Sequence, residues 1–542
     1  SELCIGDTAL DLAELKLARR LKKLMFGHDF DQRLDDMILP SGLETLTFGM
    51  NFDQSLVGVL LPETLKELTF GHRFNQSLEG TRLPDGLEVL NIECDFDQCL
   101  DGVKLPSSLQ VLQFGSFNQS LQNVIFPSRL HTLNLGDAFN QGLKGLCFPT
   151  GLKTLIFGHQ FDQCLQGVNL PSGLETLSVG QKFSKSLAGV ELPSGLQTLT
   201  LGRTFNQSLE NVGLPSGLQS LTFGVRFNQR LQDAKLPAGL KVLTFGQSFR
   251  LSLEGINWPG GLQSLTFGQK FDKTLQGVAL PSGLKKLAFG DEFNQSLQGV
   301  HFPAALETLS FGQSFNQSLK GVTFPCGLGS LSFGRCFDQS LQEAELPSGL
   351  HTLTLGADRV KSWAGTIWPN GLQKLIFGPN FNQTLEEMIL PGGLHELTFG
   401  QEFNSSLDSA ALPCGLQTLI FGDKFNQPLQ NINLPKGLRK LILGDDFNQS
   451  LVGVDLPDGL QTLSFGLAFT NTLVGVKLPA ALEALTFDDR YNESLEGASL
   501  PSGLKALSFG TDFNQSLADV PLPSGLQALT FGRRFNQSLA GN

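Results

Sequence analysis

Hydrophobic and polar residues follow a pattern that repeats every 22 residues along nearly the whole chain. The repeat is marked by a proline that runs from Pro40 through Pro62 to Pro106, takes one 21-residue step to Pro127, and then keeps a 22-residue spacing to Pro523. A fixed period of this size is typical of a solenoid, in which each repeat forms one coil and stacks on its neighbours. The pattern therefore predicts one elongated domain.

The coil that begins at Pro40 contains two apolar segments. Leu43, Leu46 and Phe48 have the LxxLxF spacing of a short strand that places Leu46 and Phe48 on one face. Gly49 then ends this strand, because a residue without a side chain permits a sharp turn. We expect the apolar face of each coil to be buried by the next coil.

The second apolar segment of this coil is Leu56, Val59 and Leu61, with the spacing LxxVxL. It predicts a second short strand, which Pro62 closes because proline cannot donate to a ladder. The expected fold is therefore mainly β: a right-handed, leucine-rich-repeat-like solenoid of about 24 coils with two short parallel strands per 22-residue turn.

A phenylalanine recurs at the position of Phe52 in nearly every coil, from Phe30 to Phe535. It predicts a stacked aromatic spine inside the solenoid. Asn or Asp follows this phenylalanine in most coils, as at Asn75 and Asn316. Asn and Asp satisfy backbone groups in tight turns, so we interpret this row as an internal asparagine ladder.

The recurring phrase LPxGLxxLxFGxxFNQxL is most complete around Phe425-Asn426-Gln427-Pro428-Leu429. It resembles the FNIP repeat, a subclass of leucine-rich repeats of roughly 22 residues, and the resemblance extends from about residue 12 to residue 542. The resemblance implies a leucine-rich-repeat-like solenoid and a role in protein interaction. It brings no catalytic residues with it.

Charge and cysteine content narrow the possible partners. The net charge is −12 and the charged residues are spread without acidic or basic runs, which argues against a nucleic acid or an anionic membrane as partner. No apolar run approaches the roughly 20 residues of a membrane span. The eight cysteines form no CxxC pair, and only Cys94 and Cys99 lie close enough to suggest a disulfide.

The sequence contains no set of residues that indicates catalysis. The histidines do not cluster, and no Ser-His-Asp set or phosphate loop stands out from the repeat. We therefore expect a protein that is not an enzyme and has no metal and no cofactor. A cytoplasmic location is favoured, since the scattered thiols fit a reducing compartment and the Asn residues of the FNQS sequons would be packed in the ladder; secretion is the alternative.

The outward positions of the first strand form the main candidate binding face. In nine coils both positions carry Thr or Ser: Thr45/Thr47, Thr176/Ser178, Thr198/Thr200, Ser220/Thr222, Ser264/Thr266, Thr308/Ser310, Ser330/Ser332, Thr352/Thr354 and Thr462/Ser464. Such columns are similar to the TxT arrays of ice-binding solenoids, although Ile, Lys, Glu and His occur elsewhere on this face. The other interpretation is an ordinary solvent-facing strand or a generic protein-binding face.

A second candidate lies where the repeat is broken. The coil that follows Pro347 loses its Phe-Asn-Gln and instead carries two cations and two tryptophans, Arg359, Lys361, Trp363 and Trp368. Trp and Arg are common at binding hot spots, so these residues form a candidate docking spot. Alternatively, the two tryptophans fill apolar positions of the core.

We expect residues 1–11 to form a short N-terminal cap and residues 12–542 to form the solenoid, with its C-terminal end uncapped. The pattern favours a scaffold that mediates protein–protein interaction or structural assembly through its long faces. One alternative is an ice-binding or crystal-surface protein that uses the Thr/Ser columns. Another is a subunit that associates end to end into a filament, because bare strand edges invite pairing.

Overall fold

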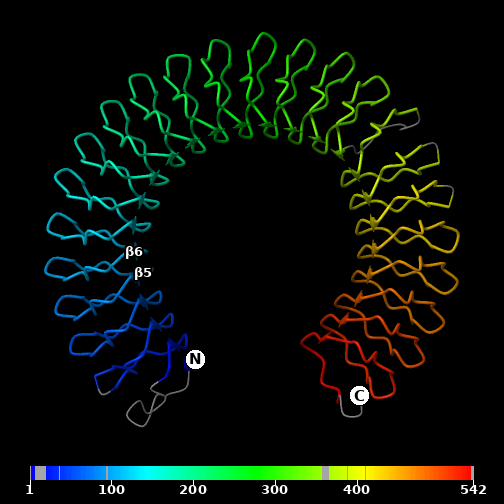
Figure 1. Ribbon diagram of the computed structural model, residues 1–542, viewed down its shortest axis with the longest axis horizontal. Helices are drawn as coiled ribbons and strands as arrows, with labels where there is room; N and C mark the ends of the chain where they lie inside the picture. Colours follow the sequence, from blue (N-terminus) through cyan, green and yellow to red (C-terminus); the bar gives the residue numbers. More distant parts are fainter. Residues whose placement is uncertain are drawn as a thin grey trace. The chain divides into compact units, whose positions relative to one another are not determined.

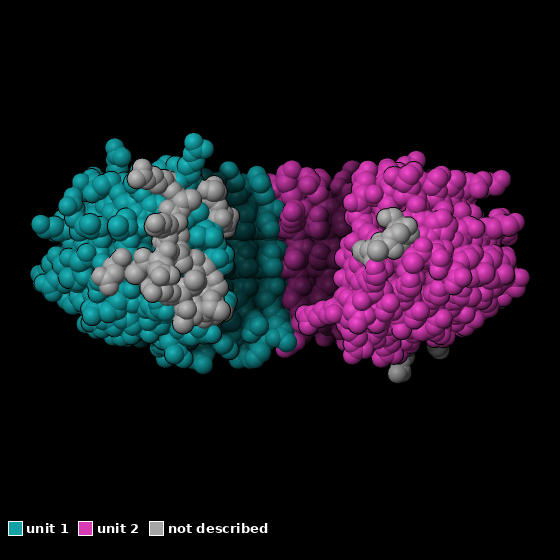
Figure 2. Space-filling view, turned by 90° about the horizontal axis from the view of Figure 1, so that it is seen from below, with its two compact units in different colours: residues 1–271 teal, residues 272–542 magenta. Residues whose placement is uncertain are grey.

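The structure is a computed structural model, which describes residues 2–5, 20–35, 37–92, 95–356, 365–386, 388–408 and 410–538. The chain divides into two compact units, Ser1–Phe271 and Asp272–Asn542, coloured teal and magenta in Figure 2. Each unit is a stack of coils, and each coil contributes one short strand to a parallel sheet (Figure 1).

The strands are three or four residues long. Unit 1 contains β1 Glu2–Ile5, β2 Lys23–Phe26, β3 Thr45–Thr47, β4 Glu67–Thr69, β5 Val89–Ile92, β6 Val111–Phe114, β7 Thr132–Asn134, β8 Thr154–Ile156, β9 Thr176–Ser178, β10 Thr198–Thr200, β11 Ser220–Thr222, β12 Val242–Thr244 and β13 Ser264–Thr266. Unit 2 contains β14 Lys286–Ala288, β15 Thr308–Ser310, β16 Ser330–Ser332, β17 Thr352–Thr354, β18 Lys374–Ile376, β19 Glu396–Thr398, β20 Thr418–Ile420, β21 Lys440–Ile442, β22 Thr462–Ser464, β23 Ala484–Thr486, β24 Ala506–Ser508 and β25 Ala528–Thr530.

The predicted solenoid and its core are confirmed. Within each unit consecutive strands pair in parallel with equivalent residues opposite each other, as for Leu199 and Leu221. In the coil of β3 the side chains that point inward are fully or almost fully buried: Leu43, Leu46, Phe48, Phe52, Leu56, Val59 and Leu61. Each coil therefore depends on its neighbours to cover its apolar side chains.

The predicted second strand is wrong. The segment Leu56–Val59 forms a tight turn, in which the Val59 N–H donates to the Leu56 carbonyl oxygen at 3.1 Å. Gly58 has a φ of 89°, the left-handed conformation that the third residue of a type II turn requires. The LxxV spacing thus reflects a turn with both ends in the core. The described part of the chain has one strand per coil and no helix.

Three turns and two backbone ladders complete each coil. The Leu43 N–H donates to the Pro40 oxygen at 3.0 Å, and the Phe52 N–H donates to the Gly49 oxygen at 3.5 Å. The bend that begins at the glycine after each strand, such as Gly49, is called the glycine corner. There the Arg73 N–H donates to the Met50 oxygen of the preceding coil at 2.9 Å. This corner ladder runs beside the sheet and adds a second set of backbone hydrogen bonds between neighbouring coils.

The coils within each unit are closer at the strands than at the aromatic rings. Strands in a sheet lie about 4.8 Å apart. The ring centroids of Phe48 and Phe70, just behind the sheet, are 5.4 Å apart, and those of Phe52 and Phe74, deeper in the coil, are 6.1 Å apart. Each unit therefore bends toward its strand side, and the strands line the inner side of its arc (Figure 1).

One coil has 21 residues instead of 22, and the absent residue belongs to the glycine corner, between Gly115 and Phe117. The deletion does not propagate. The ring of Phe117 is 6.2 Å from that of Phe96 and 6.2 Å from that of Phe139, so the aromatic spine continues. The strand register also continues, with Val111 opposite Thr132.

The structure describes little of the predicted N-terminal cap at residues 1–11. Within it, Glu2–Ile5 form β1, which pairs in parallel with β2. Residues 6–19 and 539–542 lie outside the described part of the chain. In the last described coil Leu526 and Leu529 are half-buried, whereas the equivalent leucines of other coils are buried.

Candidate functional site

The Thr/Ser positions form columns along the strand face of each unit. In unit 1, Thr176, Thr198 and Ser220 lie in register in one column, and Ser178, Thr200 and Thr222 lie in the other. Val242 interrupts the first column before Ser264, and Thr266 continues the second. In unit 2 the columns run from Thr308/Ser310 through Ser330/Ser332 to Thr352/Thr354. Nearer the N-terminus, Thr45 and Thr47 of β3 pair with Glu67 and Thr69.

The hydroxyl-bearing side chains of these columns are half-buried, while the leucine between them is fully buried. In β14 the two positions are Lys286 and Ala288, and Ile376 and Ile420 occupy the second column in β18 and β20. The strand face is therefore a mixture of hydroxyl, aliphatic and charged side chains with regular spacing.

A groove of about 630 Å³ runs along the strand face of unit 2 beside the glycine corner. Its lining includes the second-column residues Thr354, Ile376, Thr398 and Ile420, and the corner glycines Gly356, Gly378, Gly400 and Gly422. These glycines are buried and let the backbones of neighbouring coils approach closely, because a Cβ at Gly378 or Gly400 would overlap the backbone of the preceding coil. In the sequence the isoleucines stand out only as interruptions of the Thr columns, so the groove was not predicted. The sequence does contain a signal for the groove: Thr and Ile alternate at the second column from coil to coil, and a glycine follows two residues later in each coil.

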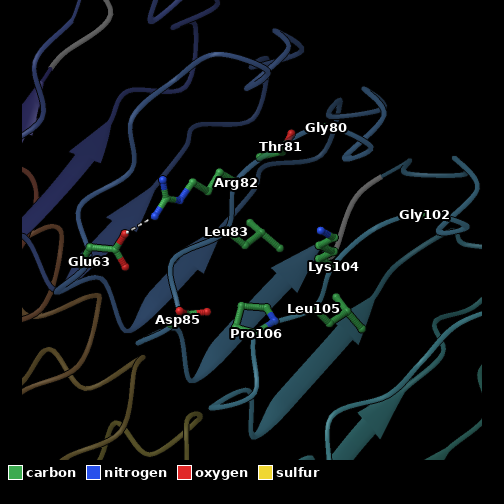
Figure 3. Close-up of a pocket in the computed structure, with 10 residues that line it drawn as sticks. All are labelled: Glu63, Gly80, Thr81, Arg82, Leu83, Asp85, Gly102, Lys104, Leu105 and Pro106. Atoms are coloured by element: carbon green, nitrogen blue, oxygen red, sulfur yellow. Dashed lines mark hydrogen bonds and ion pairs between the residues drawn. The ribbon is translucent and has the colours of Figure 1, made fainter.

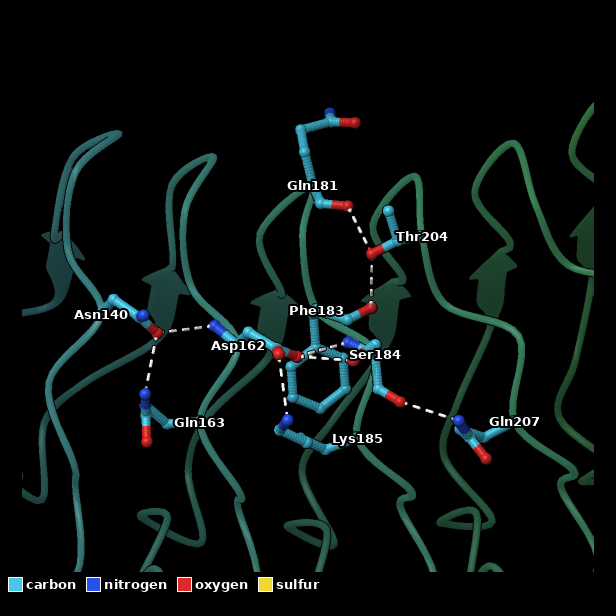
Figure 4. A network of polar contacts seen from close by, with 9 residues as sticks. All are labelled: Asn140, Asp162, Gln163, Gln181, Phe183, Ser184, Lys185, Thr204 and Gln207. Carbon is cyan, nitrogen blue, oxygen red and sulfur yellow. Dashed lines mark hydrogen bonds and ion pairs between the residues drawn. The ribbon is translucent and has the colours of Figure 1, made fainter.

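The predicted asparagine ladder exists, with backbone groups as well as side chains as donors (Figure 4), but it is not internal as expected, because Asn75 and Asn206 are exposed. The Asn140 Oδ1 accepts a hydrogen bond from the Asp162 N–H at 2.9 Å and another from the Gln163 Nε2 at 3.0 Å. The same pair of bonds recurs at Asn206, which accepts from the Asn228 N–H and the Gln229 side chain. Each Asn or Asp thus ties its coil to the backbone of the next coil.

Asp162 is a charged member of this ladder that also forms an ion pair. It accepts from the N–H and the Oγ of Ser184, both at 2.8 Å, and forms an ion pair with Lys185 at 3.0 Å (Figure 4). Partial burial acts to raise the pKa of this carboxyl, but the hydrogen bonds from Lys185 and Ser184 outweigh it, so its pKa lies below the ordinary value. Asp162 is a structural group that stays ionised near neutral pH.

The predicted docking spot is described only in part. Arg359, Lys361 and Trp363 lie outside the described residues. Trp368 is 8% exposed and stands just before Pro369, at the position that Leu61 occupies before Pro62. Trp368 is therefore part of the core, as the alternative interpretation expected.

A hollow of about 460 Å³ lies at the outer turns of the coils that follow β3, β4 and β5 (Figure 3). Arg82 on its wall is held by Glu63 at 3.4 Å, and Lys104 lies on the other side. In the described residues no group of three or more His, Cys, Asp and Glu side chains could hold a metal ion. Cys99 is a free, exposed thiol, and Cys94 lies outside the described part.

Tyr491 replaces phenylalanine in the aromatic spine, between Phe469 and Phe513. It is 1% exposed, and its hydroxyl has no hydrogen-bond partner among the residues that the structure describes. Burial, with a smaller contribution from Glu493, raises the pKa of this phenol well above its ordinary value. The hydroxyl is thus buried at a cost in free energy.

We expect Tyr491 to make the protein sensitive to alkali. The folded pKa is raised, so the unfolded state ionises first, and the free energy of unfolding falls as the pH rises above about 10. Tyr491→Phe should remove this loss and stabilise the protein by about 1 kcal/mol at neutral pH, because a buried unpaired hydroxyl is removed. Melting curves of both proteins between neutral pH and pH 11 measure the difference. Equal alkaline losses in the two proteins would contradict the prediction.

These features define a class: a solenoid of leucine-rich-repeat type, with one parallel strand per coil. The model of the FNIP Repeat family matches the chain at residues 14–51, 52–95, 74–116, 96–138, 117–158, 139–182, 183–225, 227–270, 271–314, 315–358, 365–402, 403–446, 469–512 and 513–542. The chain therefore belongs to the FNIP repeat family, as its sequence indicated.

Solved structures agree with this assignment. The chain is 38% identical to CroV588, described as a novel circular LRR protein structure, with a TM-score of 0.68; the match covers 96% of this chain and 74% of CroV588. The TLR13–ssRNA13 complex shares the fold at 13% identity, with a TM-score of 0.53 and coverage of 97% and 76%. No curated protein matches the chain. The described residues hold no apolar helix of membrane-spanning length.

Proposed function

We propose that the protein is a non-enzymatic scaffold that binds a protein partner along its strand face. The groove of unit 2 carries this proposal. Its lining alternates hydroxyl and aliphatic side chains over a floor of corner glycines, which suits a partner that offers both apolar side chains and hydrogen-bonding groups. Solenoids of this type commonly use the regular face of their stacked coils for binding.

Blocking the groove should remove binding of the partner. In Thr354→Arg/Thr398→Arg two long cations would project into the groove from β17 and β19. We expect affinity purification with this variant as bait to lose at least nine tenths of the partner that the unchanged protein retains. The control is Thr323→Arg/Asn433→Arg, which adds the same charge at exposed outer turns of the same unit.

Both variants should melt within a few degrees of the unchanged protein, because the four positions are half-buried or exposed. Equal retention of the partner by the groove variant and the control would show that binding does not use the strand face. Loss of the partner from both variants would show that added charge alone prevents binding.

Ice or crystal binding is a second candidate, supported by the in-register columns from Thr176/Ser178 to Ser220/Thr222. The bend of each unit toward its strands opposes it, because a concave face meets a flat crystal plane at few points. Absence of thermal hysteresis and of ice shaping at micromolar protein would rule out the ice form of this candidate. The end-to-end filament predicts a mass that rises with protein concentration in light scattering, and a constant monomer mass would exclude it.

A further inference from the structure

Seven cations gather on one segment of five consecutive coils in unit 1. This basic band consists of Lys182, Lys185, Arg203, Arg226, Arg230, Arg250 and Lys270. All seven side chains are exposed, and they lie between the glycine corner of each coil and the leucine that follows the buried phenylalanine. The segments 181–186, 203–208, 225–230 and 247–252 contain no Asp or Glu, and in the fifth coil Asp272 follows Phe271. The sequence has no basic run here, and the cations gather only because the coils stack.

The cations of the basic band are mostly not neutralised within the protein. Lys185 forms an ion pair with Asp162 at 3.0 Å. Across the described residues, no ion pair within 4 Å is present for the other six cations. In unit 2, cations of the equivalent segments do form ion pairs: Lys424 pairs with Asp446 at 3.4 Å, and Arg534 pairs with Asp512 at 2.8 Å. Unit 1 thus has a local positive potential in a chain of net charge −12.

The spacing of the basic band fits an extended polypeptide. The phenylalanines that it flanks are stacked with centroid distances of 6.1 Å from Phe183 to Phe205, 6.2 Å from Phe205 to Phe227, and 6.3 Å from Phe227 to Phe249. At the depth of these rings the coils are therefore stacked about 6 Å apart, and the cations occupy several positions of the segment, from two residues before its phenylalanine (Arg203) to three residues after it (Arg230). Side chains on one face of an extended chain repeat every two residues, about 6.6 Å.

The cations of the basic band favour carboxylate groups on a bound polypeptide. Four of the seven cations are arginines, whose planar guanidinium groups bind carboxylates and phosphates through paired hydrogen bonds. Proteins that bind single-stranded nucleic acid add exposed aromatic rings on which bases stack. Here the rings of the five phenylalanines in these segments are at most 1% exposed, and the segments contain no other aromatic residue: Phe183, Phe205, Phe227, Phe249 and Phe271.

We propose that the basic band is a docking site for an acidic polypeptide segment that binds in an extended conformation, with carboxylates at alternating positions. Successive carboxylates would meet the cations of successive coils. None of the seven cations lines the groove of unit 2, so this site does not depend on the function proposed above.

The test uses a fluorescently labelled peptide of six Glu-Ala repeats and the full chain, with binding measured by fluorescence anisotropy at low salt. We expect saturable binding that weakens at least tenfold at 0.3 M salt, because exposed ion pairs are screened. A peptide of equal composition with its six Glu residues in one block should bind less tightly, because its carboxylates do not match the spacing of the coils.

The variant Arg203→Glu/Arg226→Glu should weaken binding of the alternating peptide at least tenfold. The control Lys235→Glu/Lys241→Glu changes the net charge equally, at exposed positions outside the band in the same unit. It should keep the affinity within about twofold. Melting curves are expected to be similar, because all four side chains are exposed.

Three results would overturn the proposal. Equal losses in the two double variants would show a non-specific charge effect. Tighter binding of a labelled single-stranded 20-nucleotide RNA than of the peptide would identify a nucleic acid ligand. Self-association that only Arg203→Glu/Arg226→Glu abolishes, measured by sedimentation without peptide, would identify a second copy of the chain as the occupant.

Discussion

Replacing Gly224 with alanine is expected to lower the free energy of unfolding of unit 1 by about 3 kcal/mol or more. A Cβ at Gly224 would overlap the carbonyl oxygen and carbon of Gly202 in the preceding coil. Neither atom can move away without shifting the corner ladder, in which the Arg226 N–H donates to the Arg203 oxygen at 2.8 Å. Thermal melting and amide hydrogen exchange would measure the loss, which should be centred on the coils next to the substitution.

The control is Gly213→Ala in the adjacent coil, where an added Cβ meets no atom within 4 Å. It should change stability by no more than about 0.5 kcal/mol. Asp488 stands at the position of the corner glycine in its coil, so it shows the effect of a side chain there on the corner ladder. In that coil the expected corner bond from the Arg490 N–H to the Leu467 oxygen is missing among the described residues. Equal stability of the two alanine variants would refute the role of the glycine row.

Phe227→Ala is expected to destabilise unit 1 by about 3–5 kcal/mol, because it removes a fully buried ring and leaves a cavity. The ring of Phe227 is 0% exposed. Its centroid lies 3.7 Å from that of Phe223 in the same coil and 6.2 Å from that of Phe205 in the preceding coil. The loss therefore interrupts stacking both within and between coils.

Phe302→Ala makes the same change at a half-buried ring that stacks on Phe324 at 6.0 Å. It should cost only about 1 kcal/mol, because less apolar surface becomes exposed. Solenoids can unfold from one end, so hydrogen exchange resolved by coil should accompany the melting curves. A similar loss of stability in both variants would contradict a dominant role of the aromatic spine.

The sequence was sufficient to predict the stacked coils, the buried apolar positions and the register of the Thr/Ser columns. These follow from spacing alone, because equivalent residues of identical repeats must lie above one another. The second strand could not be excluded in this way, since the spacing of Leu56, Val59 and Leu61 also fits a strand. The conformation of Gly58 decides between the two, and glycine is equally compatible with several turns.

Surface features were harder to predict than the core. The basic band contributes only one or two cations per coil, so Arg203, Arg226 and Arg250 are far apart in sequence and form no basic run. They become neighbours only when the chain is folded at its period. The groove of unit 2 also depends on folding, because it requires Thr354, Ile376 and the corner glycines to come together from different coils.

The coil between Pro106 and Pro127 has a wider consequence. One residue is absent at its glycine corner, yet the strand register and the ring stacking on both sides are unchanged. The corner is therefore a place where the length of a repeat can vary without disturbing the rest of the array. Loops grafted at this point could be displayed along the solenoid, and duplicated coils of slightly different length could be joined to a growing array during evolution.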